Sequence, residues 1–152
     1  MPLSVGDPAP DFALTDQHGR TVRLSDVSGR KAALIVFYPW AFTGVCGGEL
    51  HAMQADLDEL MTDEVELLTV SCDSMYALRA FADREGFTFP MLSDFWPHGA
   101  VASAYGVLDP DIGIALRGTF LVDREGVVRW SVVHSIPDAR DVADYAKAIA
   151  AL

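Results

Sequence analysis

The sequence predicts an α/β protein whose central sheet is covered by helices on both faces. Residues 32–37 are apolar at every position, and residues 65–71 form a second, mainly apolar run, as expected of strands buried inside a sheet. The segment between them has apolar residues at helical spacing, so the three elements form a βαβ unit. Residues 117–123 and 127–133 are β-branched runs joined by a turn, and they predict a hairpin near the C-terminus.

The N-terminal region predicts another hairpin in front of this unit. Residues 5–14 contain two prolines and end in apolar residues, so we expect an extended arm that leads into a strand. Residues 16–20 predict a turn, and the alternation over residues 21–24 predicts an edge strand. A short helical turn follows and ends at residues 28–29.

The segment after Cys46 predicts one long amphipathic helix that extends to Met61. Its apolar residues recur with a period of 3.6, and the polar side chains between them fall mainly on the other side. The apolar face consists of Leu50, Met53, Leu57, Leu60 and Met61.

Further elements follow the second buried strand. Asp73 and Ser74 are suited to cap the start of a helix over residues 76–84, and Gly86 is suited to end it. The remaining elements are expected as a short strand at 89–93, a short helix at 100–105 and a terminal helix that opens at residues 137–138.

This order of elements predicts one domain over residues 1–152 with a thioredoxin-like architecture. We expect a central mixed β-sheet flanked by helices, with an N-terminal β-hairpin extension. Ligands of such sheets bind beyond the carboxyl ends of the strands. Cys46 lies in the turn that follows the strand at residues 32–37, so it falls at that edge.

The composition limits which classes of partner and which cellular compartment are expected for this protein. The 152 residues carry a net charge of -11, which argues against nucleic acid or an anionic membrane as a partner. The N-terminus lacks the pattern of a signal peptide, no stretch approaches the length of a membrane span, and two cysteines then indicate a reducing cytoplasm. The four histidines are not at metal-ligand spacing, so neither a metal nor a cofactor is expected.

Cys46 is the candidate nucleophile of the chain. The amides and partial positive charge at the start of a helix favour the thiolate, which is the reactive form of cysteine. Thr43 lies three residues before Cys46 and Pro39 seven before it, so a hydroxyl and a thiolate can face one small pocket beside a fixed proline. A cysteine after a strand can also be a small core residue, and only the complete Pro-x-x-x-Thr-x-x-Cys pattern favours the reactive interpretation.

The pattern from Pro39 to Cys46 resembles the active-site signature of the peroxiredoxin family. Residues 5–12, 92–99, 104–107 and 117–123 also resemble segments of this family, so the resemblance spans nearly the whole chain. Residues 41–44 and 93–101 are most similar to the one-cysteine subgroup of the AhpE type. The resemblance implies a thioredoxin-like fold and a thiol-dependent peroxidase that acts on hydrogen peroxide, organic hydroperoxides or peroxynitrite.

The resemblance also implies roles for individual residues. Cys46 would attack the peroxide and become a sulfenic acid, and Arg117 would stabilise the thiolate and the leaving oxygen. Thr43 would orient the peroxide, and Pro39 would shield the sulfur. From the residues alone, Arg117 could instead face solvent, and Thr43 could be only a turn or helix cap.

Glu49 matches a recurrent glutamate of the family and has two interpretations. It is a charge in the first turn that the helix dipole favours, or it orients Arg117 or another cation. The sequence alone favours the dipole interpretation.

Cys72 is the only other cysteine, and its role decides how the enzyme is regenerated. It is either a small apolar residue at a strand end or a resolving or redox-sensing thiol. The position five residues after Cys46 is His51, which excludes one known resolving scheme, and no C-terminal extension carries a cysteine. The AhpE-like resemblance therefore implies an external reductant: a low-molecular-weight thiol, or a glutaredoxin-, mycoredoxin- or thioredoxin-like protein.

Two other classes of function compete with the peroxidase. A disulfide oxidoreductase needs Cys-x-x-Cys, and Glu49 stands where the second thiol would be. A non-enzymatic redox sensor or holdase would need exposed apolar surface. The aromatic residues Trp40, Phe42, Phe95 and Trp96 are candidates for the core, the rim of the active site or the interface of a homodimer or higher homo-oligomer, which the family resemblance implies.

Overall fold

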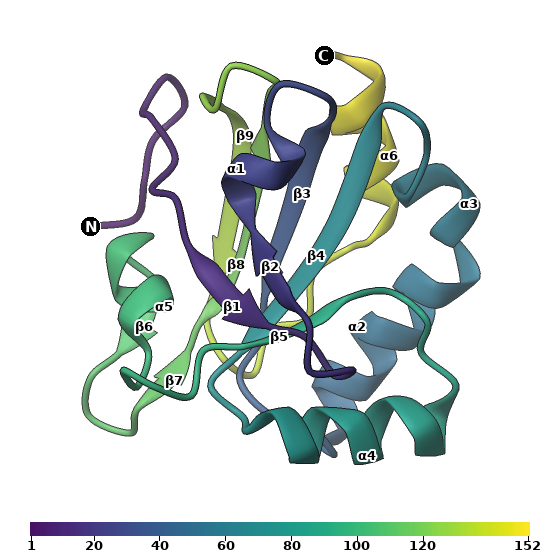
Figure 1. Ribbon diagram of the computed structural model, residues 1–152, viewed down its shortest axis with the longest axis vertical. Helices are drawn as coiled ribbons and strands as arrows, with labels where there is room; N and C mark the ends of the chain where they lie inside the picture. The colour runs from purple at the N-terminus through teal and green to yellow at the C-terminus, as the bar shows by residue number, and fades with distance from the viewer.

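A seven-stranded mixed sheet organises the chain in the computed structural model, which describes residues 1–152 (Figure 1). The spatial order of its strands is β2-β1-β5-β4-β3-β8-β9. Their bounds are β1 Ala13–Thr15, β2 Thr21–Arg23, β3 Ala32–Phe37, β4 Val65–Ser71, β5 Met91–Ser93, β8 Arg117–Val122 and β9 Val128–His134. A separate two-stranded sheet pairs β6 Leu108–Asp109 with β7 Ile114–Ala115. The helices are α1 Leu24–Val27, α2 Gly44–Ala55, α3 Leu57–Leu60, α4 Met75–Glu85, α5 Ala100–Ala104 and α6 Ala143–Ala150.

Strand β3 lies at the centre of the sheet, and all six of its residues are buried. It pairs in parallel with β4 and antiparallel with β8. Alternate residues of β3 pack into two different cores: Leu34 and Val36 face α2, α3, α4 and α6, whereas Ile35 and Phe37 face α1 and α5. Two covered faces explain why the strand has no polar position.

The pairing of β3 with β8 determines which residues meet at the carboxyl end of β3. Val36 lies opposite Thr119, and residues directly opposite each other in an antiparallel pair point to the same face. Two residues further along, Arg117 and Tyr38 both lie on the side of the sheet that α2 covers. The loop that leads from Tyr38 to α2 closes over this end.

Most sequence predictions of the fold are confirmed. The thioredoxin-like mixed sheet with its N-terminal hairpin is present, and β3 and β4 have the predicted bounds. Ser74 caps α4 by accepting a hydrogen bond of 3.2 Å from the amide of Ala77. Gly86 ends the same helix in the left-handed region, with φ of 77°.

Two helix predictions are wrong in their bounds. The long helix begins at Gly44, before Cys46, and is interrupted at Asp56, so α2 and α3 are separate. Met53 and Leu60 are buried in the same core on either side of the interruption. The apolar spacing therefore continues across Asp56, and the sequence pattern does not reveal the break. The terminal helix begins at Ala143 instead of residues 137–138, because the preceding segment carries Arg140 inward to Glu49.

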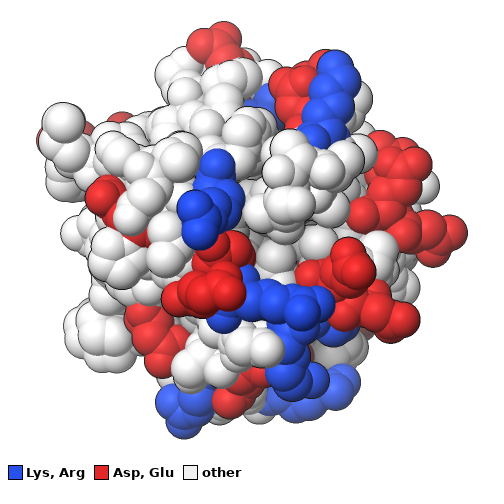
Figure 2. Space-filling view, turned by 90° about the horizontal axis from the view of Figure 1, so that it is seen from above, with Lys and Arg blue, Asp and Glu red and all other residues white.

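The surface opposite the Cys46 loop has a mixed charge pattern. Figure 2 views the end of the molecule that carries the C-terminus and shows Lys and Arg side chains interspersed with Asp and Glu. Ion pairs between Lys31 and Glu66 and between Arg129 and Asp123 form part of this pattern. None of the helices has the length and apolar character required to cross a bilayer.

Candidate active site

Cys46 is the third residue of α2, and its side chain is fully buried. The chain reaches it through a sharp turn in which Phe42 has φ of 64°, a conformation that residues other than glycine rarely adopt. The Phe42 ring compensates by packing against Phe81 at 4.9 Å between centroids, with the Arg84 guanidinium 4.6 Å from its centre. Helix α4 thus supports the turn that presents Cys46.

The same turn is also held from the end of strand β4. Asp73 Oδ2 accepts a hydrogen bond of 2.9 Å from the amide of Ala41 and one of 2.7 Å from the hydroxyl of Ser71. Since Ala41 lies in the middle of the loop, this carboxylate connects the loop to the sheet. No pattern in the sequence distinguishes this role from the capping of α4 that Asp73 was expected to share with Ser74.

Arg117 lies beside the sulfur of Cys46. Its Nη1 donates to Cys46 Sγ at 3.3 Å and to Glu49 Oε1 at 2.6 Å, while Nε donates to the carbonyl of Ile136 at 2.6 Å. Only 2% of the residue is exposed, so the alternative in which Arg117 faces solvent is wrong. It is brought there because β8 runs antiparallel to β3 and starts where β3 ends.

Glu49 is bound by two buried arginines. Besides its contact with Arg117, it accepts two parallel bonds from the guanidinium of Arg140, Nε to Oε2 and Nη2 to Oε1, each 2.9 Å long. The amide of Arg140 adds a bond of 2.7 Å to Oε2. The favoured dipole interpretation of Glu49 was therefore wrong: the carboxylate is buried and orients cations.

The electrostatics of Glu49 reflect these contacts. Burial by itself raises the pKa of this carboxyl, but the hydrogen bonds and charge of Arg140, together with the charge of Arg117, outweigh burial and lower the pKa below its ordinary value. Glu49 is therefore ionised at neutral pH.

The buried cluster of Glu49, Arg117 and Arg140 carries one surplus positive charge. One carboxylate faces two guanidinium groups, and the Cys46 sulfur is the other ionisable group that Arg117 contacts. An uncompensated charge is costly in the interior, and one negative charge on the Cys46 sulfur would make the cluster neutral. This arrangement can stabilise negative charge on sulfur and on any oxygen that approaches it.

Arg140 is the functional residue that the sequence did not indicate. It is buried, and its Nη1 also donates to the carbonyl of Gly118 and to Thr119 Oγ1, each at 3.0 Å. A single arginine ahead of a helix has no motif around it. The only signal was Glu49, for which the sequence allowed an unnamed cation as a partner.

Thr43 and Pro39 lie at opposite ends of the loop. Thr43 precedes α2 as its N-cap residue, but its side chain does not cap the helix, and its Oγ1 donates instead to the carbonyl of Trp40 at 3.0 Å. Pro39 is buried directly after Tyr38.

Cys72 is a free, buried thiol beyond the end of β4. Burial is the main cause that raises its pKa to about 12, together with the charges of Asp94 and Asp73, and a hydrogen bond with the backbone of Ala115 acts in the opposite direction. A thiol that remains protonated is a poor nucleophile. The burial of Cys72 agrees with the interpretation as a small apolar residue at a strand end.

The other predicted features are scattered around the molecule. No group of three or more His, Cys, Asp or Glu side chains is arranged to hold a metal ion. The four aromatic residues considered for core or rim are all exposed, and Trp96 has the largest exposed fraction at 80%. The core interpretation is therefore wrong for these four residues.

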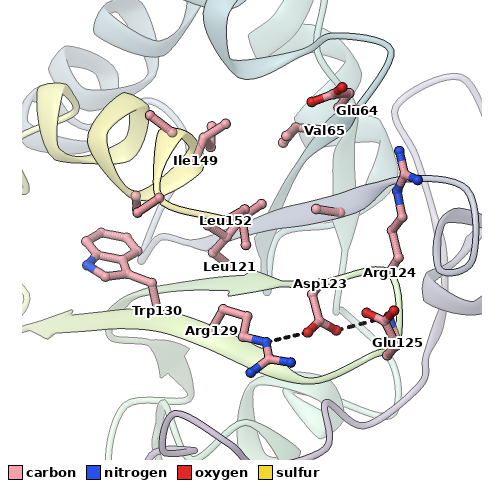
Figure 3. Close-up of a pocket in the computed structure, with 14 residues that line it drawn as sticks. Glu64, Val65, Leu121, Asp123, Arg124, Glu125, Arg129, Trp130, Ile149 and Leu152 are labelled. Carbon is pink, nitrogen blue, oxygen red and sulfur yellow. Dashed lines mark hydrogen bonds and ion pairs between the residues drawn. The ribbon is translucent and has the colours of Figure 1, made fainter.

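One cavity lies away from Cys46. It has a volume of about 830 Å³ and is lined by Val65, Leu121, Trp130, Ile149 and Leu152, among others (Figure 3). It lies at the opposite end of the sheet, where β3 and β4 begin. A smaller groove of about 540 Å³ lies along the start of α2 and is lined by Val45, Gly48, Glu49 and Arg140. The second groove is the one adjacent to the buried ion cluster.

The fold and the Cys46 site agree with the relationship found by sequence comparison. The sequence profile of the AhpC/TSA family matches residues 5–131. The chain therefore belongs to the AhpC/TSA family of peroxiredoxins.

Within this family the chain is similar to alkyl hydroperoxide reductase E of Mycobacterium tuberculosis (strain ATCC 25618 / H37Rv). The two are 46% identical over 150 residues, which cover 99% of this chain and 98% of that protein. The 2-Cys peroxiredoxin BAS1 of Hordeum vulgare is 36% identical over 162 residues, covering 100% of this chain and 76% of that protein. The predicted resemblance to AhpE-type peroxiredoxins is confirmed.

Solved structures agree on the fold. A reduced 2-Cys peroxiredoxin of Plasmodium vivax superimposes with a TM-score of 0.88 at 31% identity, covering 99% of this chain and 82% of that chain. AhpC of Mycobacterium tuberculosis superimposes with a TM-score of 0.88 at 28% identity, covering 99% of this chain and 98% of that one.

Acidification is expected to remove the stabilisation that Glu49 provides. Because the pKa of Glu49 is lowered from 4.5, this stabilisation is fully present above that pH and is lost as the pH falls through the lower pKa of the folded state. We expect Glu49→Gln to reduce the free energy of unfolding by about 3 kcal/mol at neutral pH, and by progressively less in acid. Urea unfolding of both proteins across this pH range measures the difference.

Glu59→Gln is the matched control, since Glu59 is exposed in α3 and makes no side-chain hydrogen bond. Its effect should be small at every pH. A loss for Glu49→Gln that stays constant on acidification would contradict the charge assignment.

Proposed function

We propose that residues 1–152 act as a single-domain, thiol-dependent peroxidase with Cys46 as its nucleophile. The observation that carries this proposal is the contact of 3.3 Å from Arg117 Nη1 to Cys46 Sγ, inside a cluster that the thiolate makes neutral. Membership of the AhpC/TSA family supports the same chemistry.

In the proposed reaction, the Cys46 thiolate attacks the terminal oxygen of a hydroperoxide. The S–O bond forms as the O–O bond breaks, so sulfur is oxidised by two electrons and the peroxide is reduced. The leaving alkoxide or hydroxide takes a proton from solvent. Cys46 is then a sulfenic acid.

Arg117 and Thr43 would bind the peroxide during this step. Both hydrogens of Arg117 Nη1 are committed to Cys46 and Glu49, but Nη2 donates no hydrogen bond to the protein and so is free for the leaving oxygen. The hydroxyl hydrogen of Thr43 is committed to Trp40, which leaves its oxygen to accept from the peroxide O–H. Pro39 would shield the sulfur from water.

The proposed substrates are hydrogen peroxide and organic hydroperoxides, with peroxynitrite as a further candidate. Trp40, Phe42 and Val45 lie close to Cys46 in the chain and are 41%, 45% and 41% exposed. Apolar side chains at the mouth of the site suit the carbon chain of an alkyl hydroperoxide.

Regeneration is proposed to depend on an external thiol. The burial and raised pKa of Cys72 give no support to the alternative in which it acts as the resolving thiol. The proposed reductants are a low-molecular-weight thiol or a glutaredoxin-, mycoredoxin- or thioredoxin-like protein, which fits the reducing cytoplasm expected for two free thiols. A homodimer is the proposed assembly.

Peroxide-treated protein tests the central proposal by intact mass. A few equivalents of hydroperoxide should add one oxygen to the wild type and to Cys72→Ser, and none to Cys46→Ser, because Cys46 alone is the nucleophile. Loss of two hydrogens in the wild type, abolished by Cys72→Ser, would instead reveal a disulfide. No oxidation of the wild type would refute the peroxidase.

Arg117→Met should slow the oxidation of Cys46 by on the order of 100-fold, because it removes a charged donor from the developing negative charge. Stopped-flow fluorescence with limiting peroxide measures the rate. Arg129→Met is the control, since Arg129 lies on β9 with a largely exposed side chain paired to Asp123. If the two variants oxidise at the same rate, Arg117 has no part in the reaction.

Gly47 and Gly48 should matter for reduction more than for oxidation. Cys46 is fully buried, so a bulky thiol reaches it only if the first turn of α2 opens, and each glycine weakens that turn by roughly 1 kcal/mol relative to alanine. Alanine fits at both positions, where an added Cβ meets no atom within 4 Å. Gly47→Ala combined with Gly48→Ala should slow reduction by roughly 30-fold and leave peroxide oxidation nearly unchanged. Single-turnover kinetics of both steps provide the test, and equal slowing of the two would argue against opening.

A further inference from the structure

The hydroxyl of Tyr38 is a buried polar group without a partner. Tyr38 is completely buried, and its OH is the only buried side-chain nitrogen or oxygen that makes no hydrogen bond. The other fully buried tyrosines are paired: Tyr105 OH donates to the carbonyl of Pro10 at 2.7 Å, and Tyr145 OH bonds Thr119 Oγ1 at 2.8 Å. Buried polar groups in native proteins are almost always paired, so this exception requires an explanation.

Tyr38 packs in the same core as Cys46, and the charge of Cys46 contributes to the raised pKa of Tyr38. It ends the run of alternate β3 side chains that pack into the same core as Cys46. The antiparallel pairing of β3 with β8 also places Tyr38 and Arg117 at the same end of the sheet. The unpaired hydroxyl is thus enclosed at the end of the sheet that carries the Cys46 site.

The phenol of Tyr38 keeps its proton and is therefore a donor. Burial raises its pKa well above the ordinary value, the nearby Ser71 hydroxyl lowers it, and the charges of Asp73 and Cys46 raise it further. Ser71 is close enough to affect the pKa of Tyr38 but does not meet the geometry of a hydrogen bond, and it donates to Asp73 instead.

Apart from Arg117 Nη2, the side-chain donors of Arg117 and Thr43 near Cys46 are committed. Arg117 Nη1 has given both hydrogens to Cys46 and Glu49, and Thr43 has given its hydrogen to Trp40. Arg117 Nη2 is free, but it is not among the sealed, unpaired atoms, so it retains contact with solvent. Tyr38 is the donor that gains a first partner when an acceptor atom is added to Cys46.

We propose that Tyr38 donates a hydrogen bond to the oxygen that Cys46 acquires from peroxide, and that this bond protects the sulfenic state against a second oxidation. The inference rests on the proposed function, which creates that oxygen. In the second oxidation, the sulfur of the sulfenate attacks another hydroperoxide, a second S–O bond forms as the O–O bond breaks, and the products are a sulfinate and an alcohol or water. A hydrogen bond to the sulfenate oxygen withdraws electron density from sulfur and slows that attack.

Tyr38→Phe tests the proposal, with Tyr105→Phe as the matched control, both in the Cys72→Ser background. Tyr105 is equally buried but packs in the core on the other face of the sheet. Proteins are treated with graded hydroperoxide without thiol, and intact mass follows the first and second oxygen separately. Tyr38→Phe should take up the second oxygen roughly 2- to 10-fold faster, the factor expected for one neutral hydrogen bond, while Tyr105→Phe matches the parent.

Urea unfolding of the reduced proteins gives a second measurement that does not depend on peroxide. Tyr38→Phe should unfold at the same or a higher urea concentration than the parent, because its hydroxyl has no partner, whereas Tyr105→Phe should unfold at a lower one. Equal destabilisation of the two variants would show that the Tyr38 hydroxyl is already paired, and would overturn the proposal.

The outcomes separate this inference from the proposed function. If the parent takes up one oxygen at Cys46 and Tyr38→Phe takes up the second oxygen no faster than the parent, only the role of Tyr38 is overturned. The same result follows if Tyr105→Phe accelerates the second oxidation equally. If the parent takes up no oxygen, the proposed function fails and the inference fails with it.

Discussion

Glu49 holds two buried guanidinium groups with one carboxylate, and the geometry around Cys46 depends on this contact. Arg140 is fixed by two parallel bonds to Glu49, and Arg117 shares the same carboxylate while it reaches the sulfur. A buried ion cluster is costly to desolvate and contributes little net stability by itself. It does impose specificity, because two positive charges and one negative charge leave a place for a thiolate. The chemistry of the site therefore follows from a charge imbalance that the interior cannot screen.

The cluster depends on chain topology as much as on charge. Glu49 comes from α2, Arg117 from β8 and Arg140 from the segment before α6, so three distant parts of the chain meet at one end of β3. The antiparallel pairing of β8 with β3 brings Arg117 to that end. The segment before α6 stays non-helical up to residue 142, which lets both the amide and the side chain of Arg140 reach Glu49. Each of these elements bears on how the thiol is positioned.

The site combines a rigid part with a part that can open. Glu49 and the arginines form the rigid part, and Asp73 and Phe81 hold the loop from α4 and the end of β4. The first turn of α2 contains Gly47 and Gly48 and has open space around both. In the proposed function, a peroxide approaches the closed site and a reducing thiol enters after the turn unwinds. Tyr38 packs in the same core as Cys46, and its unpaired hydroxyl is the donor that we propose for the oxidised sulfur.

The sequence by itself determined the fold class, the bounds of β3 and β4, the cap at Ser74 and the choice of Cys46 as the proposed nucleophile. These features depend on local periodicity and on residues close together in the chain, including Pro39 and Thr43. The resemblance of residues 117–123 to peroxiredoxins added Arg117, but its burial beside the sulfur required the sheet register. Only the tertiary structure decided that Glu49 orients cations, that Arg140 belongs to the site and that the Tyr38 hydroxyl has no partner. Such contacts join residues far apart in the chain, and no local pattern encodes which charges share one buried volume.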